Sequence, residues 1–292
     1  MLTLVTANST LPEIGLNLPA GDHVRIALHG AHVLSWQTAD GQERLYLSPK
    51  AVLDGQSPIR GGVPVCFPQF NNRVLGDVVL PKHGFARTSL WQLESQTASP
   101  IEAIATLTLQ DSPQSRAFWP CAFAAQLKVR LTSGQLRLEF SVRNTDAVAW
   151  PFALALHTYL QVSGITQAVL HGLQGQIYWD AVQHLQDMTV RQPQAEAGLT
   201  FASEMDRVYA AAAAALPTLV LHDKTGALQI TQSPNLTETV VWNPGPVLCA
   251  ALADMPDDGY KHMLCVEAAR IDAPITLHPG ESWTGWQQLT AI

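Results

Sequence analysis

Apolar and polar residues alternate with a period of two along much of this 292-residue chain, the pattern of β-strands that bury one face. The clearest case is segment 126–144, where apolar residues at every second position flank a Ser133-Gly134 turn. These positions are Leu127, Val129 and Leu131 before the turn, and Leu136, Leu138, Phe140 and Val142 after it. The arrangement predicts an antiparallel hairpin with one buried face.

Shorter segments of the same kind recur along the chain, with turn residues between them. We expect strands within 23–38, 44–48, 89–95, 102–110, 216–233, 237–243, 262–271 and 281–292, the fifth with a Lys224-Thr225-Gly226 turn. Segment 209–216 is compatible with a helical turn, and 201–207 is ambiguous. A series of about a dozen short strands predicts a large all-β sandwich or barrel. Because no repeat, linker or low-complexity tail divides it, we expect a single domain over 1–292.

The composition narrows the possible partners. Hydrophobic residues make up 47% and charged residues 14% of the chain, which is typical of a globular protein. A net charge of -7 argues against duplex nucleic acid, whose binding depends on many phosphate contacts. The first residues lack the pattern of a signal peptide, and the longest run of low polarity, 209–221, is too short to span a bilayer. We therefore expect a cytoplasmic protein with no membrane partner, and a monomer.

The four cysteines show neither metal-ligand nor redox spacing, so the sequence predicts no metal site from them. Cys66, Cys249 and Cys265 lie in apolar contexts, which predicts buried free thiols.

Residues 57–91, which we call the cationic segment, concentrate positive charge on this acidic protein. The segment carries Arg60, Arg73, Lys82, His83 and Arg87 between positions 60 and 87, against the single acid Asp77. Such a local concentration of cations favours a small anionic ligand. The segment is also rich in proline, which stiffens a loop, and in glycines that can adopt positive φ, namely Gly61, Gly62 and Gly84.

His157 lies in the predicted strand 150–160, at the end of a row in which Ala153 and Ala155 share its face. Small residues leave room in front of the imidazole, whose pKa range suits proton transfer. The alternative is a core histidine satisfied by a backbone carbonyl.

Glu267 lies within the apolar strand 263–271, where an ionised carboxylate must be paired or must face a polar site. Burial would raise its pKa and make it a better base near neutral pH. The alternative is a salt bridge to Arg270 or to another cation. Arg270 is three residues away, so on a strand it would point to the opposite face.

A histidine and a glutamate on two inward strand faces suit the interconversion of sugar anomers. That reaction removes a proton from the hydroxyl on C1 and gives one to the ring oxygen, which opens the hemiacetal. Water performs it slowly, so it requires neither metal nor organic cofactor.

Five motifs in order, SPIRGGVPVCFPQF, LPKHGFAR, LHTYL, DRVY and DDGYKHMLCVEAARI, resemble the hexose-6-phosphate mutarotase branch of the aldose 1-epimerase family, the glucose-6-phosphate 1-epimerases. The resemblance covers most of the chain. It implies the galactose-mutarotase-like β-supersandwich and an isomerase in which Glu267 is the base on the C1 hydroxyl and His157 the acid to the ring oxygen.

For the substrate, the resemblance and the charge pattern together imply a hexose 6-phosphate. Arg60 and Arg87 are the candidates for the phosphate, since guanidinium groups bind it bidentately. His83 and Asp206 are candidates for sugar hydroxyls, although Asp206 could instead form a cap or a local ion pair. Lys82 stands where the family commonly has glutamine; the added cation beside Arg87 could strengthen phosphate binding or indicate a somewhat different substrate. The sequence leaves the preferred hexose open.

Two other functions fit the same sequence. One is an aldose 1-epimerase for unphosphorylated sugars, for which the arginines would be surface residues paired with acids. The other is a sugar-phosphate-binding protein without catalytic activity, for which an acid and a base would be unnecessary.

Overall fold

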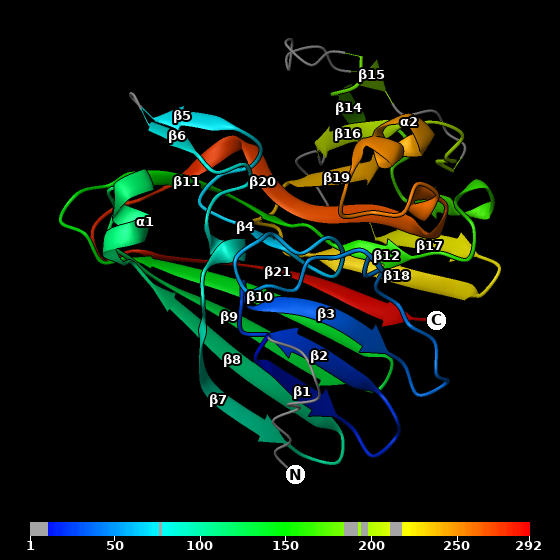
Figure 1. Ribbon diagram of the computed structural model, residues 1–292, viewed down its shortest axis with the longest axis horizontal. Helices are drawn as coiled ribbons and strands as arrows, with labels where there is room; N and C mark the ends of the chain where they lie inside the picture. Colours follow the sequence, from blue (N-terminus) through cyan, green and yellow to red (C-terminus); the bar gives the residue numbers. More distant parts are fainter. Residues whose placement is uncertain (1–10, 76–77, 184–191, 194–197, 211–217) are drawn as a thin grey trace.

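The computed structural model describes residues 11–75, 78–183, 192–193, 198–210 and 218–292 (Figure 1). Two large antiparallel sheets dominate the described part of the chain. The all-β prediction is therefore confirmed.

Sheet I contains the long hairpin strands. In order across the sheet they are β13 (Val169–His171), β17 (Leu219–Asp223), β18 (Gly226–Gln232), β21 (Ser282–Ala291), β10 (Gln135–Asn144), β9 (Phe123–Thr132), β8 (Glu102–Gln110) and β7 (Gln92–Ala98). The β9–β10 hairpin has the predicted register, and Gly134 adopts a φ of 64° in its turn. The β17–β18 hairpin is confirmed as well.

Sheet II carries the two predicted site carboxylates, Asp206 and Glu267. Its order is β15 (Gln192–Pro193), β14 (Ile177–Asp180), β16 (Met205–Ala210), β19 (Glu238–Asn243), β20 (Met263–Leu277), β11 (Trp150–Leu156) and β4 (Val65–Cys66), and β12 (Tyr159–Gln161) pairs with β20 beside this path. Two smaller sheets join β1 (Glu13–Asn17), β2 (His23–Ala27) and β3 (His32–Gln37), and β5 (Arg73–Leu75) with β6 (Val78–Leu80).

The main core lies between the two large sheets. Alternation along β11 sends Phe152, Leu154 and Leu156 into the same buried cluster as Leu127 and other inward residues of sheet I. On the opposite face of sheet II, β11 carries the small residues Ala153 and Ala155 instead. Ala155 of β11 and Ala269 of β20 belong to a separate cluster on that face, as the alternation predicts.

One local expectation is wrong, because segment 44–48 forms isolated bridges at Leu45 and Leu47 rather than a continuous strand. The structure also decides two segments that the sequence left open. Tyr209 and Ala210, which were compatible with a helical turn, end the strand β16, and 211–216 lie outside the described residues. The ambiguous segment 201–207 contributes the first residues of β16.

Short helices were not expected. They are α1 (Pro113–Phe118), α2 (Gly245–Ala251) and the 3₁₀ turns Ala86–Thr88, Ile165–Gln167 and Gly259–His262. Helix α1 begins with a capping box, in which Ser112 and Ser115 each accept a hydrogen bond from the backbone N–H of the other. Helices of six and seven residues are too short to show a helical hydrophobic period.

Candidate active site

The outer face of sheet II brings residues from four strands into one row. Asp206 of β16 pairs with Trp242 of β19, Trp242 pairs with Cys265 of β20, and Cys265 pairs with Tyr159 of β12. Residues opposite one another in antiparallel strands point to the same face. Glu267 lies two residues after Cys265 and so shares this face.

His157 meets Glu267 on this face. His157 directly follows β11, where its backbone N–H donates to the carbonyl of Pro64 at 3.0 Å. Its Nδ1 lies 3.3 Å from Glu267 Oε1, and the two residues are only 7% and 1% exposed. Within the described residues, neither this Nδ1 nor Glu267 Oε2 makes a hydrogen bond. The pair therefore has polar atoms available to a third group.

Burial opposes the charge on both members of the pair. Desolvation raises the pKa of Glu267 well above its ordinary value; the nearby Asp206 raises this pKa further, while Lys82 lowers it. Desolvation lowers the pKa of His157 well below its ordinary value, and the positive charges of Arg87 and Arg60 lower it further. Both shifts favour a neutral carboxylic acid beside a neutral imidazole.

Arg270 is not the partner of Glu267. Its Nε donates to the carbonyl of Ala273 at 2.7 Å, and its Nη1 donates to Thr237 Oγ1 at 2.8 Å. The alternative of a salt bridge between Glu267 and Arg270 is therefore wrong.

His83 is a second neutral histidine in contact with His157. The two rings lie edge to face with centroids 5.6 Å apart, and Phe70 packs against His83 at 4.7 Å. The backbone N–H of Asn71 donates to His83 Nδ1 at 3.2 Å, which places the ring proton on Nε2. Burial, first among the causes, lowers the pKa of His83 well below its ordinary value. His83 can therefore act as a hydrogen-bond donor through Nε2.

The glycines that the structure describes in the cationic segment adopt positive φ, as predicted, and they make close contacts within the protein. Gly62 has a φ of 59°, and a Cβ there would lie 2.2 Å from the carbonyl oxygen of Val33. Gly84 has a φ of 74°, and a Cβ there would lie 2.1 Å from the carbonyl oxygen of Phe67. Only glycine fits such close backbone contacts at positive φ. These backbone contacts hold the chain next to Arg60 and His83 in place.

Arg60 is partly buried and paired. Its Nε lies 3.1 Å from Asp254 Oδ1, and its Nη1 donates to the hydroxyl of Tyr159 at 3.1 Å. The alternative of an arginine paired with an acid is thus present for Arg60. Asp254 is itself held in place, because its carbonyl accepts a hydrogen bond from Ser48 Oγ at 2.6 Å.

Arg87 lies in the 3₁₀ turn Ala86–Thr88, and Lys82 lies in the loop that precedes this turn. Arg87 Nη2 donates to the carbonyl of Lys82 at 2.7 Å. The buried Nε of Arg87 makes no hydrogen bond among the residues that the structure describes. Lys82 is exposed, and its charge lowers the pKa of both Glu267 and Asp206. Arg73 lies in β5, and Asp77 lies outside the described residues.

Asp206 has no ion pair with its neighbour. Arg207 Nε donates to Asp180 Oδ2 at 3.0 Å, and its guanidinium lies over the ring of Tyr178. Burial raises the pKa of Asp206 to about 6, with Lys82 acting against that shift. The alternative of a local pair with Arg207 is therefore wrong, and Asp206 remains a candidate ligand for a polar group.

The sequence did not single out Tyr159, Trp242 or Asp254. The only local signal was the position of Tyr159, two residues after His157 in LHTYL. The prediction of buried free thiols is confirmed for Cys66, Cys249 and Cys265.

Among the residues that the structure describes, one group of side chains could hold a metal. The donor atoms of His157, Cys265 and Glu267 lie within 4.8 Å of one another. Nitrogen, sulfur and oxygen donors are the ligand types of zinc. The interconversion of sugar anomers, which the sequence predicts for His157 and Glu267, requires no metal.

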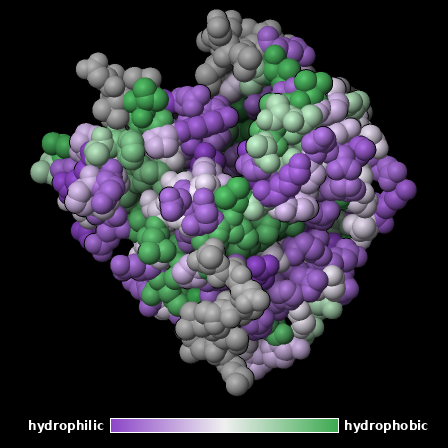
Figure 2. All heavy atoms as spheres, viewed as in Figure 1, coloured by the Kyte–Doolittle hydropathy of each residue, from purple (hydrophilic) through white to green (hydrophobic). Residues whose placement is uncertain are grey.

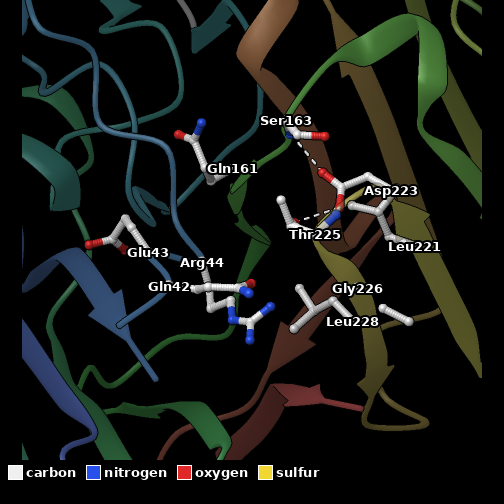
Figure 3. Close-up of a pocket in the computed structure, with 11 residues that line it drawn as sticks. Gln42, Glu43, Arg44, Gln161, Ser163, Leu221, Asp223, Thr225, Gly226 and Leu228 are labelled. Carbon is white, nitrogen blue, oxygen red and sulfur yellow. Dashed lines mark hydrogen bonds between the residues drawn. The ribbon is translucent and has the colours of Figure 1, made fainter. Parts of the chain in front are cut away.

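The surface is hollowed between the part that carries the β5–β6 hairpin and the part that carries β14 and β16 (Figure 2). Strands β11 and β20 run between these two parts in the same view (Figure 1). A separate pocket of about 320 Å³ contains none of the predicted site residues; Arg44, Gln161 and Asp223 line it (Figure 3). Asp223 there already accepts hydrogen bonds from the N–H groups of Ser163 and Thr225.

Comparison with known proteins assigns the chain to a class of carbohydrate-converting enzymes. A family model for aldose 1-epimerase matches residues 13–290. The chain therefore belongs to the aldose 1-epimerase family, and an epimerase activity on a sugar follows from that membership.

Curated relatives match along nearly the whole chain. A protein of Cenchrus ciliaris named "Putative glucose-6-phosphate 1-epimerase" is 36% identical over 297 residues, which cover 99% of this chain and 87% of the relative. A protein of Salmonella typhimurium with the same name is 34% identical over 281 residues, which cover 94% and 89%.

Solved structures agree on the fold. The crystal structure of a "putative mutarotase" from Salmonella typhimurium superposes with a TM-score of 0.85 at 28% identity, covering 99% of this chain and 96% of that one. A galactose mutarotase-like protein from Clostridium acetobutylicum gives a TM-score of 0.78 at 16% identity, with coverages of 100% and 98%. The predicted galactose-mutarotase-like architecture is confirmed. Among the described residues, no helix has the length and apolar character needed to span a bilayer.

Proposed function

We propose that this protein interconverts the α and β anomers of a hexose 6-phosphate, with glucose 6-phosphate as the first candidate. The observation that carries the proposal is the buried pair of His157 and Glu267, 3.3 Å apart, in a site where Arg60, Arg87 and Lys82 supply positive charge. The names of the curated relatives support the choice of sugar phosphate.

In the proposed reaction Glu267 takes the proton of the C1 hydroxyl, and the electrons of that O–H bond form the C1 carbonyl. The bond between C1 and the ring oxygen breaks, and its electron pair stays on the ring oxygen, which takes a proton from His157. Rotation about C1–C2 and the reverse steps close the ring on the other face. Acid–base catalysis of this kind contributes about 10²- to 10⁴-fold per group.

The pair holds one proton throughout this cycle. Before ring opening Glu267 is a carboxylate and His157 an imidazolium; after opening Glu267 is a carboxylic acid and His157 is neutral. Burial raises the pKa of Glu267 and lowers that of His157, and both shifts favour the second form. The environment of the pair therefore favours the proton transfers that open the ring, and each cycle begins when the shared proton moves from Glu267 to His157.

The other predicted residues then bind the substrate. Arg60 and Arg87 hold the phosphate through charge-assisted hydrogen bonds, with Lys82 adding charge beside them. His83 donates to a sugar hydroxyl through Nε2, and Asp206 accepts from hydroxyl groups at the opposite end of the row. This chemistry requires no metal or cofactor. A cytoplasmic location, a monomeric state and a single domain stay predictions from the sequence.

The test is the anomer exchange rate of glucose 6-phosphate and of free glucose, measured by NMR magnetisation exchange with and without the purified protein. Acceleration confined to glucose 6-phosphate supports the proposal. Equal acceleration of free glucose would indicate a general aldose 1-epimerase. Tight sugar phosphate binding without acceleration would indicate a binding protein.

A further inference from the structure

We propose that Tyr159 is a positioning residue that fixes both the acid His157 and the phosphate-binding Arg60. This inference rests on the proposed function. It assigns a role to a residue that sequence reasoning left aside, and it links the two halves of the site, proton transfer and phosphate binding, through one side chain.

The ring of Tyr159 lies flat against the imidazole of His157. The two residues are two positions apart, at the short break between β11 and β12, and so share a face. Their ring centroids are 4.8 Å apart, with an angle of 9° between the planes. Trp242 meets both rings edge to face, at 6.1 Å for His157 and 6.0 Å for Tyr159. The aromatic contacts thus restrict the rotation of the imidazole.

The hydroxyl of the same tyrosine holds Arg60. It accepts a hydrogen bond from Arg60 Nη1 at 3.1 Å, while Arg60 Nε pairs with Asp254 at 3.1 Å. Two of the three guanidinium nitrogens are therefore held by hydrogen bonds, which restricts the rotation of the Arg60 side chain. A rigid guanidinium loses less entropy when it binds an anion than a freely rotating one does.

Backbone hydrogen bonds connect the same elements. The N–H of Tyr159 donates to the carbonyl of Gly62 at 2.9 Å, just beyond Arg60, and the carbonyl of Tyr159 accepts from the N–H of Tyr46 at 3.0 Å. Only 3% of Tyr159 is exposed, and burial, the largest cause, raises its pKa. The phenol therefore stays neutral across the working pH range, and its contact with Arg60 does not change with pH.

Two substitutions separate the two contacts. Tyr159→Phe keeps the stacked ring but removes the hydroxyl, so we expect KM for glucose 6-phosphate to rise about three- to tenfold with kcat within a factor of two. Tyr159→Leu removes the flat contact as well, and we expect kcat to fall at least about tenfold, since misplacing a catalytic group slows the reaction strongly. Tyr178→Phe removes a phenol hydroxyl from β14 of the same sheet and should leave both constants unchanged.

The split between kcat and KM decides the proposal. It is overturned if Tyr159→Phe leaves KM unchanged, or if it lowers kcat as much as Tyr159→Leu does. A second readout is independent of turnover: the pKa of His157, followed by NMR of histidine-labelled protein, should rise in Tyr159→Leu, where the ring is more solvated, and stay unchanged in Tyr159→Phe. If the wild type does not accelerate anomer exchange, the proposed function fails, while this titration still tests whether Tyr159 positions His157. An unchanged pKa in Tyr159→Leu would refute that positioning.

Discussion

Replacing Arg87 with alanine should weaken the use of the phosphorylated sugar alone. Arg87 is half-buried, one guanidinium nitrogen is held by the carbonyl of Lys82, and its buried Nε has no hydrogen-bond partner among the described residues. A hydrogen bond that involves a charged group contributes about 1.5–3 kcal/mol. Losing one such hydrogen bond to the phosphate should lower kcat/KM for glucose 6-phosphate by roughly 10- to 150-fold, mainly by raising KM.

The assay is NMR magnetisation exchange over a range of sugar concentrations, with glucose 6-phosphate and free glucose as parallel substrates. Arg116→Ala is the matched control, because Arg116 is an exposed arginine that pairs with Asp111 at α1, among residues assigned no role in the site. We expect the control to behave as wild type on both sugars. An equal loss of activity on free glucose in Arg87→Ala would refute the phosphate contact, since the missing interaction would then not involve the phosphate.

Three further predictions follow from the same geometry. Glu267→Gln should lower turnover by about 10²- to 10⁴-fold while calorimetry still detects glucose 6-phosphate binding; loss of both together would indicate a structural carboxylate. Activity should require the pair to hold one proton, so the pH at which activity is lost on acidification should lie below the ordinary pKa of histidine. Asp206→Asn should lower the pH at which activity is lost on the alkaline side, because Asp206 raises the pKa of Glu267. An unchanged alkaline limit in the pH–rate profile would contradict this coupling. Gly84→Ala should lower the unfolding free energy by more than Gly41→Ala does, because a Cβ at Gly84 would clash with the carbonyl oxygen of Phe67. Gly41→Ala costs only the positive-φ strain of about 1–2 kcal/mol, since no atom lies within 4 Å of its added Cβ. Equal losses in denaturant titrations would refute the close contact at Gly84.

The sheets could be predicted because their information is local. Alternation along 126–144 specifies a buried face regardless of what covers it, and the β9–β10 hairpin follows. Segment 44–48 has a similar pattern, but its bridges reach Leu160 and Gly61 rather than a neighbouring strand of the same hairpin. Partners at that separation leave no mark in the local pattern, so a continuous strand was the wrong inference.

The proposed catalytic pair, His157 and Glu267, could be picked out from the sequence for a related reason. Glu267 is conspicuous because the residues around it are apolar, and His157 because the residues that precede it on its face are small. The partners of Arg60 are different: Asp254 is 194 positions away and Tyr159 is 99 positions away. Each is an ordinary residue in its own segment, and only the fold brings the three together.

The position of Glu267 itself favours a role in chemistry over one in stability. A carboxyl group whose pKa is raised by burial contributes stability only while it is protonated, and that contribution is lost as the pH rises through the raised pKa. His157 has the opposite problem, because its lowered pKa makes folding less favourable as the pH falls. Apolar side chains of similar volume at these two positions would avoid both effects. The pair of His157 and Glu267 thus lowers stability at both ends of the pH range, and two of its polar atoms make no hydrogen bond among the described residues. Both features have a reason if a substrate completes the hydrogen bonds of the pair and exchanges a proton with it.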